Sequence, residues 1–495
     1  MDYSKLQNGS DIRGVAMGEN ANLTNDAVRD LSAAFAKWLL ARGNSDIKIA
    51  IGTDSRVTGP ALKQACIDGF TDMGAAVIDC GMASTPAMFM TTVTEGFMCD
   101  GAVMVTASHL PMNRNGLKFF TAQGGLEKGD IAELIKIAND ITKCGKTAEV
   151  KNADFMSVYA SILKNKIRSA TGEQHPFNGF KIIVDAGNGA GGFYVDKVLK
   201  PLGADTTGSQ FLEPDGTFPN HIPNPENTEA MDSIVNAVIA ANADFGLIFD
   251  TDVDRAGAVD KGGSVLNKNR LIAAISAVLL KEFPHTTIVT DSITSSGLAE
   301  FIAAHGGVHH RFRRGYKNVI NESIRLNENG TDSQLAIETS GHAALKENYF
   351  LDDGAYLVTR LLIEMAKLKK QGHTISDLIA DLKEPAESEE FRLNIAAEDF
   401  KEYGNTMISA LEEYAKKQPE FIIAPDNHEG IRVSFDAQNG SGWFLVRLSL
   451  HDPLIPVNVE SDIAGGGRII TEKLYAFLKT YDKLDLSPIE KYLKI

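Results

Sequence analysis

The segment Asp250-Thr-Asp252-Val-Asp254-Arg255 places three carboxylates at alternate positions, directly after the apolar run FGLIF. Carboxylates spaced in this way along an extended loop can converge on one hard cation, and Mg²⁺ suits such oxygen ligands best. An EF-hand also begins D-x-D-x-D, but it needs glycine at position six and glutamate at position twelve, where this chain has Arg255 and Lys261. Three carboxylates at the end of a buried strand repel one another unless a cation joins them. The pattern therefore favours a metal loop over a solvated acidic turn.

A second candidate is the segment VTASHLP, residues 105–111, which follows the small apolar run GAVMV. Its Ser108 is either a turn residue ahead of Pro111 or a group that carries a reaction. The neighbouring His109 is no evidence for a Ser-His-Asp hydrolase, since the G-x-S-x-G pattern is absent. Asn115, Gly116 and Lys118 follow shortly after. Taken alone, these residues leave both interpretations of Ser108 open.

Two further polar clusters follow strand-like runs, and for the first of them taken alone a capping turn is favoured. Glu338, Ser340 and His342 stand on one short segment after the run QLAI, where they can bind several hydroxyls of a sugar ring or form an ordinary capping turn. Arg447 and Ser449, followed by His451, come at the end of the strand-like run GWFLV. A guanidinium and a hydroxyl at a strand end suit a phosphate.

The remaining polar motifs are weaker. The segment 187–192 matches G-x-G-x-x-G, and a tight turn between strand and helix is more probable there than a dinucleotide site. Arg13 and Arg56 are each expected on a loop, where a surface ion pair would be worth little. The basic run Arg311, Arg313, Arg314 and Lys317 is by default a solvated face.

The composition limits the class of protein. A chain of 495 residues with a net charge of −16 is expected to hold three or four domains and to avoid nucleic acid and anionic membranes. The four cysteines form no C-x-x-C pair, which is typical of reduced thiols in the cytoplasm. We expect neither a membrane span nor a secretion signal at the start of the sequence. An anionic ligand would therefore need a local cluster of Arg and Lys.

These motifs must be positioned by alternating helices and strands, which predict sheets covered on both faces. Helices are expected at 24–43, 127–141, 153–170, 229–243, 354–371 and 399–417. We predict an α/β fold of three similar mixed-sheet α/β domains and a C-terminal α+β domain, with a charged boundary at 381–390. The expected domains are residues 1–150, 151–263, 264–375 and 390–495. In the first three, the polar motifs follow strands, where open α/β sheets bind ligands.

Together, and in this order, the motifs resemble those of the α-D-phosphohexomutase superfamily, which includes phosphomannomutase and phosphoglucomutase. TASHLP with the following N-G-x-K resembles the phosphoserine loop, DTDVDR the metal loop and ETSGH the sugar loop. The remaining matches are DIRG (11–14), GTDSR (52–56), Thr85-Pro86, RRGYKN (313–318) and RLSLHDP (447–453), the last at the place of the phosphate loop. The resemblance covers nearly the whole chain.

This resemblance implies four domains around one central cleft and a phosphoryl group carried by Ser108. Asp250, Asp252 and Asp254 would bind one Mg²⁺ per active site, with an oxygen on Ser108 completing the ligands. Lys118 would be the general acid or base, supported by Arg13 and His109, with a pKa lowered by nearby cations.

The resemblance also implies roles in or near the substrate-binding site for residues of several motifs. Arg255 would help to position the metal loop. Glu338 and Ser340, with His342 beside them, would bind sugar hydroxyls, because a site built for hydroxyls discriminates strongly. Arg447 and Ser449 would bind the phosphate that is not transferred, with His451 as an extra donor. Lys317, together with Arg313 and Arg314, would add positive charge.

The implied activity is an isomerase of carbohydrate metabolism that interconverts hexose 1-phosphate and hexose 6-phosphate, of mannose or glucose. It would act through a phosphoserine and a hexose 1,6-bisphosphate, and its partner would be a small phosphosugar. Alternatives are a phosphoglucosamine mutase, a sugar-phosphate phosphatase using DTDVDR as its nucleophile loop, and a sugar-phosphate sensor. We expect a cytoplasmic monomer or homodimer.

The chain departs from the family pattern at several loop positions. Leu110 stands where asparagine is usual, Ile337 where glycine is usual, and Thr251 and Val253 replace two glycines of the metal loop. The phosphate loop has Leu450, His451 and Asp452 in place of Gly, Thr and Glu. Because loss of the glycine removes a close backbone approach, we expect phosphate to be held more by side chains.

Overall fold

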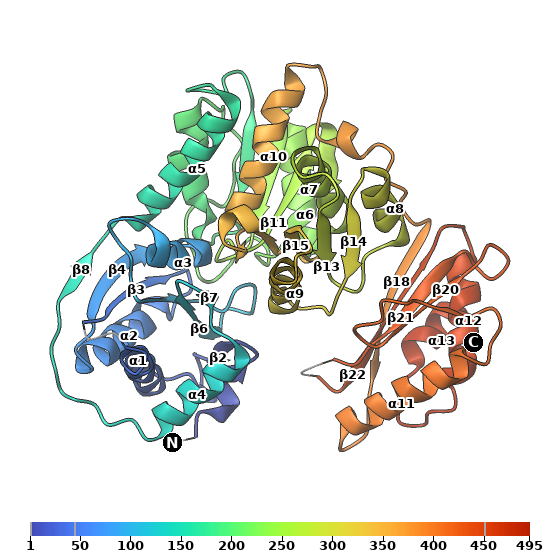
Figure 1. Ribbon diagram of the computed structural model, residues 1–495, viewed down its shortest axis with the longest axis horizontal. Coiled ribbons are helices and arrows are strands. Elements are labelled where there is room, and N and C mark those ends of the chain that lie inside the picture. The colour runs from blue at the N-terminus through green and yellow to red at the C-terminus, as the bar shows by residue number, and fades with distance from the viewer. Residues whose placement is uncertain (1, 44–45, 450–451) are drawn as a thin grey trace. The chain divides into compact units, whose positions relative to one another are not determined.

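The computed structural model describes residues 2–43, 46–449 and 452–495 (Figure 1). The chain divides into two compact units, unit 1 with Met1–Val278 and Ser340–Ile379, and unit 2 with Leu279–Thr339 and Ala380–Ile495. Both units combine helices with parallel or mixed sheets, and unit 2 adds an antiparallel sheet. The predicted fold class, α/β with a further C-terminal region of helices and strands, is therefore confirmed.

The first sheet of unit 1 is mixed. Parallel strands β3, β4, β5 and β8 form one side of it, and β6 runs antiparallel to β5 and to β2 on the other. The strand order is β1 (Gln7–Asn8), β2 (Asp11–Val15), β6 (Arg114–Thr121), β5 (Gly101–Val105), β3 (Lys48–Thr53), β4 (Ala76–Met82) and β8 (Val150–Asn152), with β7 (Gly124–Gly125) paired to β6. Its helices are α1 (Asn25–Leu40), α2 (Gly59–Asp72), α3 (Thr85–Val93) and α4 (Lys128–Asn139).

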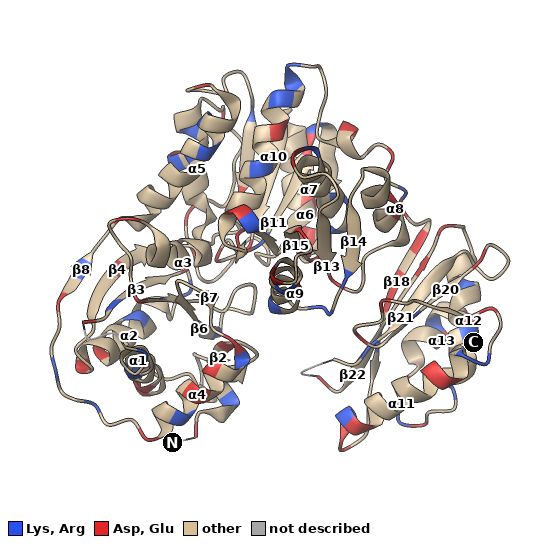
Figure 2. Cartoon of the chain, viewed as in Figure 1, with Lys and Arg blue, Asp and Glu red and all other residues tan. Residues whose placement is uncertain are grey.

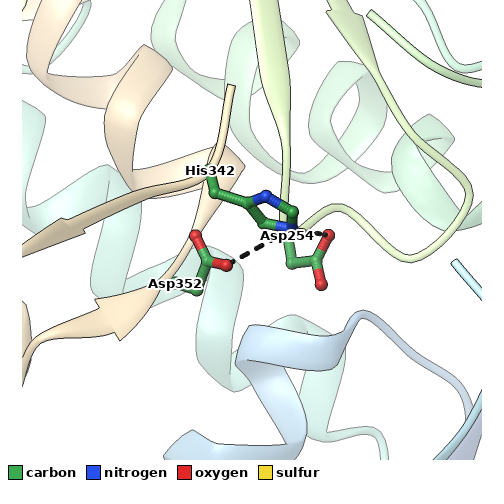
Figure 3. A group of neighbouring side chains, drawn as sticks. All are labelled: Asp254, His342 and Asp352. Atoms are coloured by element: carbon green, nitrogen blue, oxygen red, sulfur yellow. Dashed lines mark ion pairs between the residues drawn. The ribbon is translucent and has the colours of Figure 1, made fainter. Parts of the chain in front are cut away.

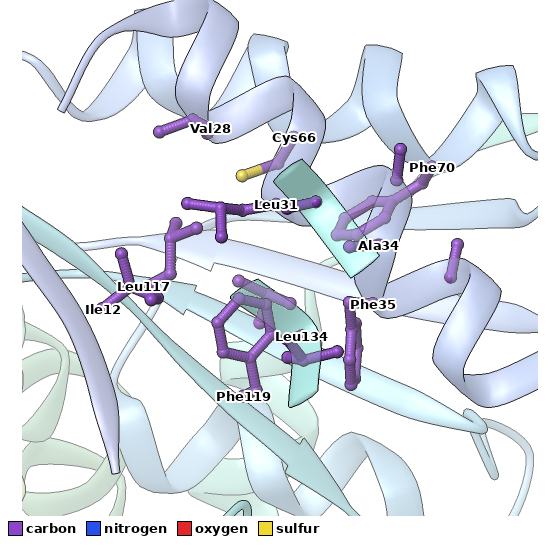
Figure 4. Close-up of a cluster of buried hydrophobic side chains, with 14 of the residues drawn as sticks. Ile12, Val28, Leu31, Ala34, Phe35, Cys66, Phe70, Leu117, Phe119 and Leu134 are labelled. Atoms are coloured by element: carbon purple, nitrogen blue, oxygen red, sulfur yellow. The ribbon is translucent and has the colours of Figure 1, made fainter. Parts of the chain in front are cut away.

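Helix α1 begins where the Thr24 hydroxyl accepts a hydrogen bond from the Ala27 N–H, as a helix cap does. The apolar residues Val28, Leu31 and Phe35 recur at helical spacing and are fully buried. Phe35 packs against Phe119 of β6 at a ring-centroid distance of 4.9 Å (Figure 4). This core fixes β5 and β6, and therefore the loop from Thr106 to Asn113 that joins them.

The second sheet of unit 1 carries the acidic segment. Its order is β12 (Ser264–Leu266), β11 (Ala256–Asp260), β10 (Phe245–Phe249) and β9 (Ile182–Asp185). All five residues of β10 are buried, as expected for an unbroken apolar run between two neighbouring strands. Helices α5 (Phe155–Thr171), α6 (Thr228–Ala241) and α10 (Gly354–Lys369) belong to this part, with the antiparallel pair β16 (Ala343–Leu345) and β17 (Leu351–Asp352). The segment 187–192 is a turn that leads into a short 3-10 helix, Ala190–Gly192.

Unit 2 contains three parallel strands and an antiparallel sheet. β13 (Thr287–Thr290) lies between β14 (Val308–Arg311) and β15 (Ser333–Ile337), with α8 (Ser296–Ala304) and α9 (Tyr316–Glu328). Helix α7 (Lys268–Glu282) runs from unit 1 into unit 2. The antiparallel sheet has the order β18 (Glu387–Asn394), β22 (Leu454–Ser461), β21 (Gly442–Val446), β20 (Ile431–Phe435) and β19 (Ile422–Ile423), with α11 (Phe400–Ala415), α12 (Gly466–Leu478) and α13 (Ser487–Leu493).

Two local predictions differ from the structure. Arg13 lies on strand β2 and not on a loop, because the short segment pairs with β6. The basic run is not one solvated face, since Arg311 ends β14 and Lys317 lies in the first turn of α9. The charged segment 381–390, expected at a boundary, follows the end of unit 1 at Ile379 and includes the first residues of β18. Figure 2 shows charges of both signs on the helices of each unit.

Candidate active site

The acidic segment forms the loop between β10 and β11, where Phe249 is paired with Ala256. Asp250, Asp252 and Asp254 are buried, and each offers an oxygen within 4.8 Å of those of the others. Val253 adopts a φ of 67°, a left-handed conformation that is unusual for a β-branched residue. The N–H of Gly354, at the start of α10, donates to the Val253 carbonyl at 3.1 Å. A side chain at Gly354 would clash, since a Cβ would lie 2.6 Å from the Arg255 backbone.

The pKa values of two of these aspartates are shifted in opposite directions. Burial, and then the charges of Asp254 and Asp252, raise the pKa of Asp250 well above its usual value. Burial would also raise the pKa of Asp254, but Lys118, His342 and Arg255 outweigh it and hold that pKa far below its usual range. Among the described residues, the buried Asp252 Oδ1 has no hydrogen-bond partner. Asp254 Oδ1 is in the same position, so among the described residues two buried carboxylate oxygens of the cluster accept no hydrogen bond. Three hard oxygen donors, two of them with such an oxygen, fit a divalent cation.

Ser108 reaches this cluster from the loop after β5. Its hydroxyl donates to Asp250 Oδ2 at 3.0 Å, across 142 positions of sequence. The residue has a φ of 51°, so the loop holds it in the left-handed region. Its N–H donates to the Thr106 hydroxyl at 2.9 Å, and that hydroxyl donates to Asp54 Oδ2 at 2.6 Å. The serine that the sequence left ambiguous therefore lies at the acidic cluster.

Arg56 organises the Ser108 loop, a role that sequence reasoning missed. Its fully buried guanidinium donates to the carbonyls of Ser108 and Leu110, and at 2.9 Å to those of Pro111 and Arg114. It also pairs with Asp54 at 3.4 Å. Burial outweighs that pairing and raises the pKa of Asp54 to about 6. The motif GTDSR marked Arg56 in the sequence, but the spacing of residues along a chain cannot show that this arginine donates to carbonyls of a loop about 50 positions away.

Lys118 extends from β6 into the acidic cluster. Its ammonium group contacts Asp252 Oδ2 at 3.0 Å and Asp254 Oδ2 still more closely. Two buried carboxylates of the β10–β11 loop therefore face the ammonium group, a contact that the expectation of nearby cations did not include. The Thr85 hydroxyl and N–H also donate to Asp252, the N–H at 2.8 Å to its carbonyl.

His109 and Arg13 flank Ser108. His109 Nδ1 lies 3.4 Å from the Ser108 hydroxyl oxygen. Burial, and then the charges of Arg255 and Arg13, lower the pKa of His109 to about 2, so the imidazole is neutral near pH 7. Arg13 donates to the Ala107 carbonyl at 3.1 Å and pairs with Asp11 at 2.9 Å. Both residues thus contact the serine loop directly.

His342 connects the sugar-loop segment of unit 1 to the acidic loop. Its Nε2 lies 3.6 Å from Asp254 Oδ1 and 3.5 Å from Asp352 Oδ2 (Figure 3). Its Nδ1 is 2.9 Å from the Ser340 hydroxyl, and Arg255 Nε is 3.1 Å from its Nε2. Arg255 also donates its N–H to Asp250 at 3.2 Å, in line with the predicted positioning of the metal loop. Asp352 faces His342, and the neighbouring Asp353 caps α10.

The other predicted substrate-binding residues belong to unit 2. Glu338 accepts a hydrogen bond from the Gly315 N–H at 2.5 Å, at the start of α9. Burial and the charge of Glu338 raise the pKa of the nearby Asp291 to about 7. Arg447 lies 3.9 Å from Glu429, and Ser449 accepts from the Asp452 N–H at 3.2 Å. Lys317 lies in the first turn of α9, whereas His451 and Leu450 fall outside the described residues.

The geometry of unit 1 thus combines a hydroxyl, an ammonium group and three carboxylates, which suits transfer of a charged group with help from a cation. Comparison with known proteins decides the family. Profiles described as phosphoglucomutase/phosphomannomutase alpha/beta/alpha domains I, II and III match residues 4–144, 157–263 and 267–385. The chain belongs to the phosphoglucomutase/phosphomannomutase family.

Individual members of this family match over nearly their full length. A phosphoglucomutase of Neisseria meningitidis serogroup A is 30% identical over 480 residues, which cover 96% of each chain. A phosphomannomutase/phosphoglucomutase of Pseudomonas aeruginosa is 29% identical, covering 98% of this chain and 96% of the relative. The crystal structure of a phosphoglucomutase/phosphomannomutase family protein from Burkholderia thailandensis has a TM-score of 0.80 at 26% identity, covering 97% and 98% of the two chains. The resemblance to the α-D-phosphohexomutases is therefore confirmed.

Two further observations concern the described parts of the chain. None of their helices combines the length and the apolar character needed to cross a bilayer. The four cysteines, Cys66, Cys80, Cys99 and Cys144, are all free thiols. The prediction of unpaired cysteines is confirmed.

Proposed function

We propose that this chain is a hexose-phosphate mutase that exchanges hexose 1-phosphate and hexose 6-phosphate. The observation that carries the proposal is the meeting of Ser108, Lys118 and Asp250 in one buried cluster of unit 1. Sequence-distant segments bring a hydroxyl and an ammonium group to an acidic loop that fits a cation. The membership of the phosphoglucomutase/phosphomannomutase family supports this activity.

In the proposed reaction, phosphorylated Ser108 transfers its phosphoryl group to a free hydroxyl of the hexose phosphate. The P–O bond to Ser108 breaks and a P–O bond to the sugar forms, which gives a hexose 1,6-bisphosphate. This bisphosphate then returns its other phosphoryl group to Ser108. Lys118 exchanges the proton of the sugar hydroxyl, as general base in one half-reaction and general acid in the other.

The loop around Ser108 keeps its hydroxyl oxygen in place during both transfers. Arg56 fixes the carbonyls of the loop, and the Thr106 hydroxyl fixes its backbone N–H. His109 stays neutral near pH 7, so we assign it an orienting role and not that of a strong base. Arg13 supports the same loop through Ala107.

Asp250, Asp252 and Asp254 are proposed to bind Mg²⁺, together with an oxygen on Ser108. When bound, Mg²⁺ would neutralise negative charge that develops on the transferring phosphoryl group. Arg255 would orient the acidic loop through its N–H contact with Asp250. We propose a hexose 1,6-bisphosphate as activator, because it supplies the phosphoryl group that a fresh enzyme needs.

Substrate recognition is proposed for the residues that the family resemblance implies. Glu338, Ser340 and His342 would bind sugar hydroxyls, with Lys317 adding positive charge, and Arg447 and Ser449 would bind the phosphate that is not transferred. His451, which lies outside the described residues, is kept as a sequence-based candidate. The free thiols support a cytoplasmic location. The proposed domain boundaries and the choice between monomer and homodimer remain predictions from the sequence.

A coupled assay on wild type and Ser108→Ala tests the proposal, with glucose, mannose and glucosamine phosphates, Mg²⁺ and the matching bisphosphate. We expect isomer exchange by the wild type and a loss of roughly a thousandfold or more in Ser108→Ala. Ser161→Ala on α5 is the matched control and should keep wild-type activity, since its hydroxyl only contacts the Ser157 carbonyl.

Each alternative predicts a different result in the same assay. Equal activity of Ser108→Ala and wild type would refute the serine mechanism. Phosphate release without isomer exchange, unaffected by Ser108→Ala, would identify a phosphatase. Binding without turnover would identify a sensor, and exchange of glucosamine phosphate alone would identify a phosphoglucosamine mutase.

A further inference from the structure

Unit 2 contains a cavity of about 460 Å³ whose lining is unusually basic for this acidic chain. Arg313 and Arg314 border it from the segment before α9, Lys401 and Asn405 from α11, and Ser449 from the segment after β21. Its volume lies within the range of about 300–1,000 Å³ that small-molecule sites occupy. The cavity therefore has the size and charge for a small anionic ligand.

Helix α11 presents Lys401 and Asn405 on one face, because residues four apart in a helix lie above one another. Asp399 accepts hydrogen bonds from the N–H groups of Lys401 and Glu402, which fixes the start of the helix. The helix packs closely on the segment that leads to Ser449. A Cβ at Gly404 would lie 2.5 Å from Leu448 Cδ1, so a larger residue there would displace the Leu448 side chain.

Positive groups outnumber negative ones around the cavity. The carboxylate that borders it, Glu429, accepts hydrogen bonds from the Ser292 hydroxyl at 2.7 Å and the Arg314 N–H at 3.0 Å. Both of these hydrogen bonds come from residues of unit 2 and hold the Glu429 carboxylate in place at the edge of the cavity. The ammonium group of Lys401 lies 5.8 Å from the ring of Phe400 at the exposed end of the helix. A phosphate dianion would complement this arrangement.

We propose that Lys401 and Asn405 bind a phosphate group of the hexose phosphate in this cavity, beside Ser449. The inference rests on the proposed mutase function and assigns α11 a direct part in substrate binding. It agrees with the sequence, in which Leu450 stands where the family has a glycine whose backbone can approach phosphate closely. Side-chain donors from α11 then supply the contacts that such a loop would otherwise give.

The test compares Lys401→Ala and Asn405→Ala with wild type, using kinetics and calorimetry with glucose 6-phosphate, glucose and inorganic phosphate. We expect Lys401→Ala to raise both the KM and the Kd for glucose 6-phosphate about tenfold, with kcat within about twofold of wild type. Asn405→Ala should show a smaller rise, because it loses a neutral donor. Lys401→Arg should retain most of the affinity. Lys417→Ala, just beyond the end of α11, is the matched control and should behave as wild type.

The outcomes separate this inference from the proposed function. An inactive wild type whose Kd for glucose 6-phosphate still rises tenfold in Lys401→Ala would refute the mutase and support the phosphate site. An active wild type with unchanged KM and Kd in both alanine variants would overturn the inference alone. Because Lys401 and Asn405 are exposed, equal melting temperatures are expected, and these check that the variants fold. An equal loss of affinity for unphosphorylated glucose would also overturn the inference.

Discussion

Lys118 and a divalent cation should compete for the same carboxylates, and Lys118→Met tests this directly. The Lys118 ammonium group lies 3.0 Å from Asp252 and closer still to Asp254, and all three groups are buried. Methionine keeps the length and apolar body of the side chain while removing its charge. The variant therefore leaves two buried carboxylates without the ammonium group that paired with both, and an added cation can take its place.

The size of the effect follows from this geometry. At 3.0 Å and an effective dielectric constant of about 20, one such pair has an attraction of roughly 5 kcal/mol before desolvation is subtracted. Removing one partner of a buried pair typically costs about 3–5 kcal/mol. Without divalent cations, we expect Lys118→Met to melt roughly 10 °C below wild type. Mg²⁺ at about 100 times its Kd should return about 2.7 kcal/mol.

The assay is thermal unfolding in EDTA and in Mg²⁺, with mutase activity as a second readout. Mg²⁺ should raise the melting temperature of Lys118→Met clearly more than that of wild type, while mutase activity stays lost. The matched control is Lys63→Met, since Lys63 pairs with both oxygens of Asp79 at 2.7 Å outside the acidic cluster. Its response to Mg²⁺ should equal that of wild type. If Mg²⁺ stabilises Lys118→Met no more than wild type, the competition between lysine and metal is refuted.

Two further predictions concern other buried charges. Arg56→Lys should lower the free energy of unfolding by about 3 kcal/mol and reduce kcat more than it raises KM. The reason is that a single ammonium group cannot replace a guanidinium that donates to four loop carbonyls. Unchanged urea unfolding and unchanged kinetics would contradict this prediction. Burial raises the pKa of Glu460 from 4.5 to about 7, so the folded state keeps a proton that the unfolded state loses. The Glu460 carboxyl alone should therefore lower stability by about 3 kcal/mol between pH 4.5 and 7, a loss that Glu460→Gln avoids. An equal pH dependence of unfolding in wild type and Glu460→Gln would count against this.

The sequence predicted much of the fold because its strands are short apolar runs that end in polar motifs. β10 is the clearest case, since FGLIF is buried throughout and leads directly into the acidic loop. β2 was missed because five residues containing an aspartate, an arginine and a glycine give no apolar pattern. Its strand character comes from pairing with β6, a contact between segments about 100 residues apart.

The sequence predicted which residues belong to the candidate site, but it did not predict which side chains contact one another there. Motif order identified Ser108, Lys118 and the three aspartates, but it did not show that two of these aspartates contact Lys118. Asp352 illustrates the same limit, because a sequence of two aspartates before a helix does not show which one caps it. Asp353 accepts from the Tyr356 N–H at 2.8 Å, which leaves Asp352 to face His342.

Two residues of the candidate site have a strained left-handed backbone conformation. In each of them a hydrogen bond to the carbonyl holds the strained conformation in place, which indicates that the strain serves the site. Ser108 and Val253 have φ values of 51° and 67°, and a left-handed conformation costs roughly 1–2 kcal/mol for a residue with a Cβ. Such conformations persist only where the surroundings fix them. Arg56 holds the Ser108 carbonyl, and the Gly354 N–H holds that of Val253. Each strained residue is thus fixed through its own carbonyl by a distant segment, which positions the Ser108 hydroxyl and the aspartates before any substrate binds.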